Sequence, residues 1–340
     1  LAQRPDTTRL DFKTELQIER LNAESQDNRD DVNRYLAEVA RRPTVAKQLE
    51  GRYTNSDFIR PLAEKSGGLW IYLYYVVPEL ERERPAPLNL EKLPHGLAGY
   101  YAEYWGDRRD GKKARGAGRA KWKAVYLPLL GALAAAQDPV EVESLAKWAG
   151  VPMDEVEELL VERWPAFIAE RTVMGSEPRY ALYHASLRDF LTGRLDRANL
   201  LPAQARLTAE LSRATTEAHR RIIAHYREQC GGEWPKLVGD DYARRHLATH
   251  LTGAEQYAEL FTLTAESNAW AEARYAKEES YAGYLNDLEL AGAQAESETG
   301  WNVGRQIRCA LIESSIRSLA GNLSPDLLLA AVKTKLWSAA

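Results

Sequence analysis

The sequence predicts a mainly α-helical fold, and three observations carry this prediction. Apolar residues recur at helical spacing along most of the chain, which is typical of amphipathic helices packed on a core. Glycine, proline and asparagine interrupt the pattern at short intervals, so the helices are expected to be short. In the middle of the chain, segments 167–170 and 180–183 are β-like and are separated by the turn-rich residues 175–178. We therefore expect helices with one small β-hairpin.

The first 107 residues are expected to hold a short strand and then a group of helices. Leu16 and Ile18 alternate with polar neighbours, which predicts a strand within residues 1–25. Asp27 or Asn28 can cap a helix that runs to about Ala40. Further helices are expected at 58–66, 69–80 and 97–105.

Residues 108–121 form a basic segment. Between Arg108 and Lys123 there are eight basic residues and three glycines, which favours a solvated loop over a packed helix. Contact with a phosphate or an acidic partner is the alternative interpretation.

Residues 122–197 have the element order of a winged-helix domain. A buried helix is expected over 122–136, and Asp138 and Pro139 supply an N-cap and a first-turn proline for a second helix, which Gly150 ends. A third helix is expected at 154–164, before the hairpin. A final helix at 187–195 closes the unit.

Residues 198–340 are expected to form a helical arm. Apolar stripes such as Ile307, Leu311 and Ile316 alternate with breaks at glycine, and successive helix pairs of this kind stack into superhelices. No fixed sequence period marks the repeats.

Composition excludes several classes of protein. A net charge of −4 argues against a surface that binds nucleic acid or an anionic membrane as a whole. The longest apolar run, Leu69–Val77, is too short to span a bilayer. Two cysteines, Cys230 and Cys309, cannot build a disulfide framework, so a reducing cytoplasm is expected. Since Leu1 is not a methionine, we expect the chain to be part of a larger intracellular protein.

The sequence carries no catalytic signature that we can identify. The motifs G-x-x-x-x-G-K-[ST], G-x-S-x-G and H-E-x-x-H are missing, and Gly116–Lys121 has the wrong spacing for a phosphate loop. His246 and His250 share a helix face, but no third metal ligand accompanies them, which favours a polar face or an interface. We predict neither a catalytic residue nor a metal site, and a stand-alone hydrolase is the weakest interpretation.

Two other functions remain open from the residues alone. A winged helix can bind DNA, but the helix at 154–164 carries five acidic residues against Arg163, and a duplex would repel that face. Nucleic acid is therefore disfavoured as a partner. The second alternative is a helical scaffold whose basic segment and aromatic surfaces contact other proteins.

Four motifs are similar to those of one known family. Residues 183–191, Tyr-His-Ala-Ser-Leu-Arg-Asp-Phe-Leu, resemble the histidine-bearing signature that ends the winged helix of STAND-class signalling ATPases, which include NACHT proteins and apoptotic ATPases. Residues 93–100 match the family's Leu-Pro-x-Gly-Leu-x-x-Tyr element, and 65–72 are similar to its Ser-x-Gly-x-Phe-Leu-Tyr helix start. Arg4-Pro5-Asp6 looks like the sequence after the sensor-1 strand, although Gln3 replaces the family's hydroxyl residue.

The resemblance implies a domain order in which the phosphate-loop half of the ATPase precedes this chain. The expected parts are the end of the ATPase core at 1–25, a helical lid at 26–107, the basic loop at 108–121, the winged helix at 122–197 and the start of a helical arm at 198–340.

The resemblance also implies a nucleotide-dependent switch. His184 would reach the β-phosphate of ADP, and Arg4, Gly68 and Pro94 fall in motifs that face the nucleotide. ADP or ATP with Mg²⁺ is expected only in the full-length protein. The implied partners are further copies of the chain upon activation and a protein or other ligand sensed by a C-terminal region. No membrane partner is expected, and signalling or antiviral defence in the cytoplasm is the expected setting.

Overall fold

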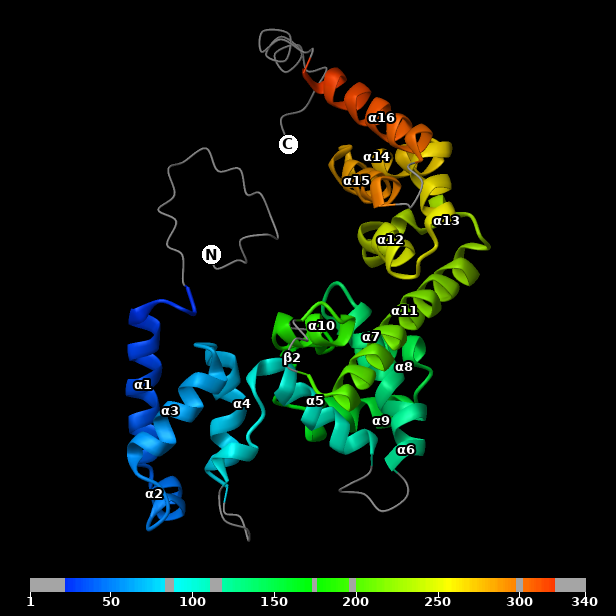
Figure 1. The fold of residues 1–340 in the computed structure, drawn as a ribbon. Helices are drawn as coiled ribbons and strands as arrows, with labels where there is room; N and C mark the ends of the chain where they lie inside the picture. Colours follow the sequence, from blue (N-terminus) through cyan, green and yellow to red (C-terminus); the bar gives the residue numbers. More distant parts are fainter. Residues whose placement is uncertain are drawn as a thin grey trace. The chain divides into compact units, whose positions relative to one another are not determined.

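A computed structural model describes residues 22–82, 89–110, 118–172, 176–195, 200–297 and 302–321. These residues are mainly helical, so the predicted mainly α fold is confirmed (Figure 1). The chain divides into two compact units, Leu1–Tyr100 and Tyr101–Ala340, and the division falls inside helix α5 (Gly96–Arg109). The strand predicted at 16–18 lies outside the described residues. None of the described helices is both long and apolar enough to cross a membrane.

The first unit is a small group of helices. They are α1 (Gln26–Ala40), α2 (Pro43–Leu49), α3 (Asn55–Ser66), α4 (Trp70–Leu80), the 3₁₀ turn η1 (Leu90–Lys92) and the beginning of α5. Ser25, rather than Asp27 or Asn28, caps α1, because its hydroxyl accepts a hydrogen bond from the Asn28 backbone N–H. Phe58 and Leu62 of α3 are fully buried, and they anchor that helix against α1.

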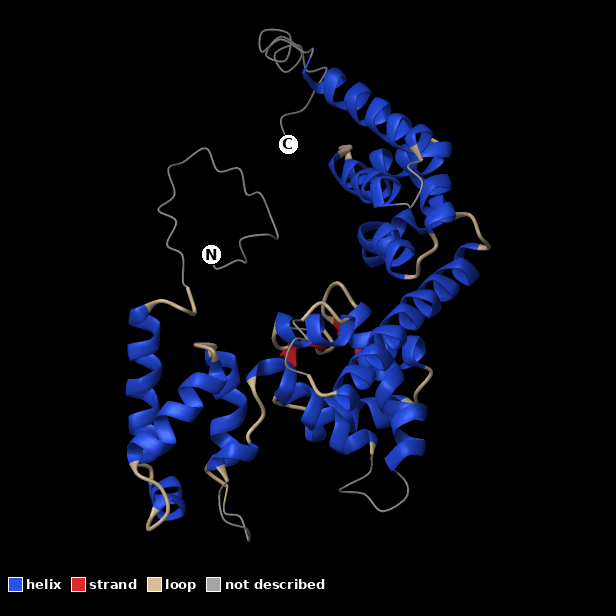
Figure 2. Cartoon of the chain, viewed as in Figure 1, coloured by secondary structure: helices blue, strands red, loops and turns tan. Residues whose placement is uncertain are grey.

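The second unit begins with a winged helix. Its elements are α6 (Gly118–Lys121), a π-helical turn (Trp122–Tyr126), α7 (Leu127–Ala135), β1 (Val140–Glu141), α8 (Val142–Ala149), α9 (Met153–Glu158), a second π turn (Leu159–Arg163), β2 (Ile168–Arg171), β3 (Arg179–Leu182) and α10 (Ala185–Thr192). The antiparallel sheet has the order β1-β3-β2, and Figure 2 shows its strands together beside α10. A first strand between the first two helices, paired with the hairpin, completes winged-helix topology.

One prediction for this region is wrong. Asp138 and Pro139 do not start the second helix, which begins at Val142. Instead, Val140 pairs with Tyr180 of β3 and its side chain is buried, so the main chain after Pro139 is extended. The sheet therefore has three strands, where the sequence predicted a hairpin alone.

The second half of α5 belongs to the winged-helix core. Trp105 is fully buried, with its ring 5.1 Å from that of Trp164 and 5.5 Å from that of Phe167. The Trp105–Trp164 pair is edge-to-face, and such a pair stabilises an aromatic core by about 0.5–1.5 kcal/mol beyond its buried area.

The arm begins with the 29-residue helix α11 (Pro202–Cys230), which packs along α7. The two helices approach closely at Gly131, where an added Cβ would lie 2.5 Å from the Ala214 carbonyl oxygen. The remaining elements are a 3₁₀ segment (Trp234–Gly239), α12 (Asp241–Gly253), α13 (Tyr257–Phe261), a π turn (Thr262–Glu266), α14 (Ala269–Glu278), α15 (Ala282–Ser297) and α16 (Val303–Gly321). Arg274 and Asp287 form a buried ion pair of 2.5 Å between α14 and α15.

Candidate functional site

The four residues predicted to face a nucleotide are distributed over the chain. Arg4 lies outside the described residues, Gly68 and Pro94 belong to the first unit, and His184 belongs to the second. We therefore describe two local sites, one in each unit. The first is a groove that contains Gly68, and the second is the start of α10 at His184.

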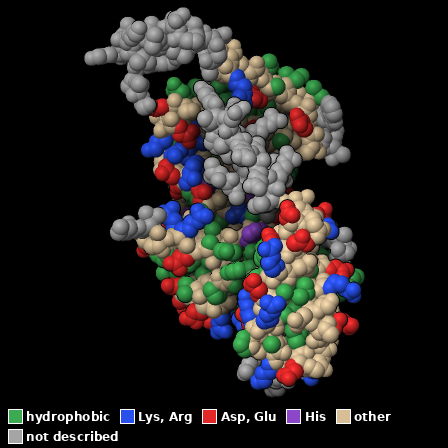
Figure 3. Space-filling model, turned by 90° about the vertical axis from the view of Figure 1, so that its left-hand side faces the viewer, with side chains coloured by type: hydrophobic (Ala, Val, Ile, Leu, Met, Phe, Trp, Pro, Cys, Tyr) green, Lys and Arg blue, Asp and Glu red, His purple; other side chains and the backbone are tan. Residues whose placement is uncertain are grey.

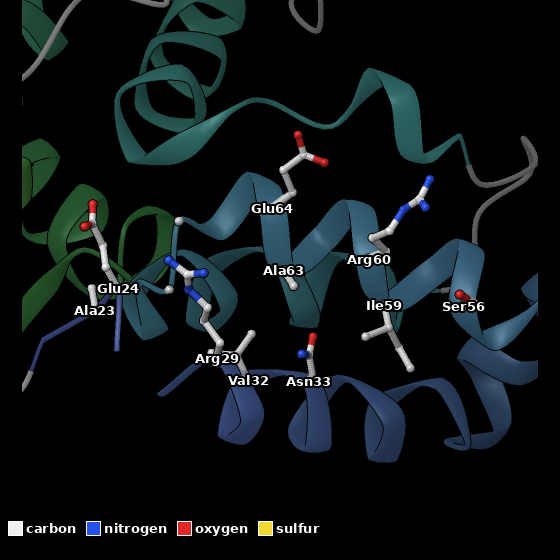
Figure 4. Close-up of a pocket in the computed structure, with 12 residues that line it drawn as sticks. Ala23, Glu24, Arg29, Val32, Asn33, Ser56, Ile59, Arg60, Ala63 and Glu64 are labelled. Carbon is white, nitrogen blue, oxygen red and sulfur yellow. The ribbon is translucent and has the colours of Figure 1, made fainter. Parts of the chain in front are cut away.

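The groove lies between α1 and α3 and ends at the Gly67-Gly68 turn (Figure 4). Its cavity volume is about 900 Å³, which is in the range of small-molecule sites. The apolar part of the lining comes from Val32, Ile59 and Ala63. The polar part comes from Glu24, Arg29, Asn33, Ser56, Arg60 and Glu64.

The Gly67-Gly68 turn needs glycine at its second position. Gly68 has a φ of +75°, and an added Cβ would lie 2.0 Å from the Ala23 carbonyl oxygen. The side-chain amide of Asn28 fixes this close approach, because its Nδ2 donates to the carbonyl oxygens of Ala23 (2.8 Å) and Gly68 (3.0 Å). Trp70 in turn donates its indole N–H to Asn28 Oδ1 at 2.9 Å. The end of the groove is therefore held rigidly by side-chain hydrogen bonds.

Two guanidinium groups give the groove its capacity for anions. Arg29 extends from α1 and Arg60 from α3 (Figure 4). Neither guanidinium makes a hydrogen bond or ion pair with another residue in the described part of the chain. Guanidinium groups match phosphate and carboxylate oxygens in a forked geometry. Glu24 and Glu64 line the same groove, so its charged side chains balance, and each guanidinium can bind an anion only locally.

Pro94 does not line the groove. Its carbonyl oxygen accepts a 2.6 Å hydrogen bond from the Tyr72 hydroxyl. The preceding carbonyls of Leu90 and Glu91 accept hydrogen bonds from the buried Lys65 ammonium, at 3.0 and 2.9 Å. In the first unit, this segment is therefore tied down by its backbone.

His184 is the N-cap residue of α10, and its side chain is partly exposed. Its Nδ1 accepts from the Ser186 backbone N–H at 3.1 Å and lies 2.7 Å from the Ser186 hydroxyl. The buried Ser186 hydroxyl also lies 2.9 Å from the hydroxyl of Tyr101. Because Nδ1 accepts from the Ser186 N–H, the proton of the neutral imidazole is on Nε2, which makes Nε2 a donor.

The surface of the third winged-helix helix does not suit DNA. Asp154, Glu157 and Glu162 are exposed on α9 and the turn that follows it. Phosphates would be repelled there, because DNA affinity depends mainly on basic contacts. In the space-filling view, acidic and basic side chains are interspersed over the visible face (Figure 3).

The predicted histidine pair on α12 serves two different contacts. His246 Nε2 lies 2.8 Å from Asp138, whereas His250 is buried and contacts His219 and Tyr242. The residues that the structure describes contain no group of three or more His, Cys, Asp or Glu side chains that could hold a metal ion.

The sequence did not indicate Arg29 or Arg60 as site residues. Both are exposed helix residues without a motif, and only the packing of α1 on α3 places them around one cavity. Comparisons of the chain with protein-family models, with curated proteins and with solved structures give no match. The functional argument therefore rests on the fold and on these two sites.

Proposed function

We propose that this chain is the regulatory switch region of a STAND-type nucleotide-binding signalling protein. In this proposal the first unit is the lid and the winged helix is the element that closes over ADP. Release of the winged helix upon activation lets the protein oligomerise. In this proposal the protein is cytoplasmic, and a C-terminal region senses a ligand.

The observation that carries the proposal is the geometry of His184. The histidine follows the winged-helix hairpin directly and caps α10, so its ring is held at a helix N-terminus. There, the helix dipole favours an anion, while the N–H groups of Ser186 and Leu187 already donate to His184. The Ser186 backbone N–H fixes the neutral tautomer that donates from Nε2. A phosphate oxygen is the kind of acceptor that this donor suits.

The groove of the first unit supports the same function. Its apolar floor and two guanidinium groups suit a nucleotide, and ADP or ATP with Mg²⁺ is the ligand that the proposal requires in the full-length protein. In this proposal Arg29 and Arg60 bind anionic oxygens, and Gly68 keeps the end of the groove open.

The test is ADP retention in the protein purified together with its ATPase core. His184→Ser keeps an N-cap acceptor but removes the imidazole, so it separates capping from nucleotide contact. Loss of one hydrogen bond to a charged group, about 1.5–3 kcal/mol, should speed ADP release roughly 10- to 100-fold. His225→Ser, a partly exposed histidine on α11, is the control and should leave release unchanged. Equal release rates in wild type and His184→Ser would refute the role of His184.

A second measurement concerns the groove. Arg29→Gln with Arg60→Gln should weaken binding of a fluorescent ADP analogue, because two unpaired guanidinium groups are removed. Arg34→Gln is a matched control on α1, since Arg34 is already paired with Asp31 at 2.8 Å. Unchanged affinity in the double variant would exclude the groove from nucleotide binding.

A further inference from the structure

A chain of hydrogen bonds links the winged helix to the first helices of the arm. The Gln137 backbone N–H, just after α7, donates to the Tyr242 hydroxyl of α12 at 3.2 Å. That hydroxyl lies 3.1 Å from Nε2 of His250, which is about two turns further along the same helix. Nδ1 of His250 then lies 2.8 Å from Nδ1 of His219 on α11. Three segments that are distant in sequence therefore meet in one polar chain.

One arrangement uses the Tyr242 proton within the chain. The Tyr242 oxygen accepts from Gln137 and donates its own proton to Nε2 of His250, which is then unprotonated. The proton of neutral His250 is therefore on Nδ1, from which it donates to His219. His219 accepts through Nδ1 and carries its proton on Nε2. In this arrangement a single proton lies between the two Nδ1 atoms, and both rings are neutral.

The histidine pair has little access to water. His250 is 1% exposed and His219 is 8% exposed. The Trp148 ring of α8 packs near His250, and Gly253 of α12 lies against the His219 ring, where an added Cβ would be 2.5 Å from ring atoms. A proton added to either ring would create a buried charge that is neither solvated by water nor paired with a carboxylate, which is unfavourable.

The charged groups around the pair also disfavour a second proton. The titratable and charged side chains that face it are Tyr242, Arg245 and His246 of α12, Asp138 after α7, Arg188 of α10 and Arg194 after α10. Burial, together with Arg188 and Arg194, lowers the pKa of His219 to about 4, and burial lowers the pKa of His250 well below its usual value. Asp138 does not compensate directly, because His246 and Arg245 already contact it.

We propose that the His219–His250 contact, continued through Tyr242 to Gln137, is a proton-sensitive latch that holds α12 against α11. Protonation of His219 at Nδ1 places two N–H donors face to face, so the 2.8 Å contact cannot persist. The rings then separate, and α12 loses this contact with α11 while its contacts with Gln137 and Asp138 remain. This inference does not depend on nucleotide binding.

The sign of the pH effect follows from proton linkage. An opened latch exposes histidines with ordinary pKa values of about 6.5, whereas His219 in the closed latch has a pKa of about 4. The open form therefore binds more protons between these values. The closed latch is fully stable above about pH 6.5 and is progressively lost as the pH falls toward 4. From one site, opening should rise by roughly two orders of magnitude between pH 7.5 and 4.5.

The test is hydrogen exchange of the α12 amides, corrected for the intrinsic pH dependence of exchange. In wild type, protection should fall by more than roughly 100-fold between pH 7.5 and 4.5, because both histidines contribute. His219→Asn places an acceptor near the position of Nδ1 that does not take up a proton, so the fall should lose the roughly 100-fold share of His219 and keep only the share of His250. His225→Asn, on the same helix, is the control and should behave as wild type. A full response in His219→Asn, or none in wild type, would overturn the proposal.

A second measurement does not depend on the variant folding. Nitrogen-15 NMR of the wild-type imidazoles at neutral pH distinguishes the two neutral tautomers. We expect a proton on Nδ1 of His250 and on Nε2 of His219. A proton on Nε2 of His250 would contradict the chain of donors on which the latch depends.

Discussion

The two histidine sites of the second unit share one acceptor atom, Nδ1, but differ in the burial of the ring. At the start of α10, His184 is partly exposed and accepts through Nδ1 from Ser186. In the latch, His219 also accepts through Nδ1, but from His250, and both rings are buried. The donor to His184 is a backbone N–H, whereas the donor to His219 is a second imidazole, and the burial of the two rings differs as well.

The difference in burial indicates which histidine is available to a ligand. Replacing a buried, hydrogen-bonded ring leaves a cavity and unpaired polar partners, so the ring is needed for stability. Replacing an exposed cap loses one local hydrogen bond, so the ring can serve a ligand at little structural cost. We therefore expect substitutions in the buried pair to lower the free energy of unfolding more than substitutions at His184.

The largest effect is expected for His250→Ala. The substitution removes a buried ring and leaves Tyr242 and His219 without their partner, which should lower the free energy of unfolding by about 2–5 kcal/mol. Urea unfolding monitored by circular dichroism measures the change. His225→Ala is the control and should stay within about 0.5 kcal/mol of wild type. A loss below 1 kcal/mol for His250→Ala would contradict a structural role for the buried ring.

A smaller effect is expected for Gly253→Ala, which tests the space around His219 without removing a polar group. The added methyl would lie 2.5 Å from the imidazole, so the ring must move out of line with His250. Overpacking of this kind costs about 1–3 kcal/mol. At Gly239 nothing lies within 4 Å of an added Cβ, so Gly239→Ala is the control. Equal unfolding free energies for the two variants would show that the ring can shift freely.

Most of the fold follows from local patterns in the sequence. Helical spacing and glycine stops located the helices because each pattern reports on one helix face and one end. Strand β1 was missed because Val140 and Glu141 are too few to show alternation, while Asp138-Pro139 imitates a helix start. The pattern also cannot say what covers a face: Ile307 and Leu311 of α16 are 53% and 63% exposed in the described part of the chain.

The sites were less predictable because they depend on contacts between distant residues. His184 could be named from its motif, and Gly68 from the Gly-Gly break. Arg29 and Arg60 have no motif, and their role depends on the packing of α1 against α3. His219 is 31 positions from His250, and no periodicity links two helices in that way. What decides these sites is tertiary packing, which the local pattern does not encode.

The smallest effect is expected for His184, and it sharpens the comparison most directly. His184→Ala removes the side-chain acceptor for the Ser186 N–H, so the free energy of unfolding should fall by about 1 kcal/mol. His184→Ser restores a capping oxygen and should return stability to within about 0.5 kcal/mol of wild type. Thermal or urea unfolding of the three proteins measures this series. If His184→Ser were as unstable as His250→Ala, the ring would be a structural element like the latch, and the argument for a ligand at α10 would fail.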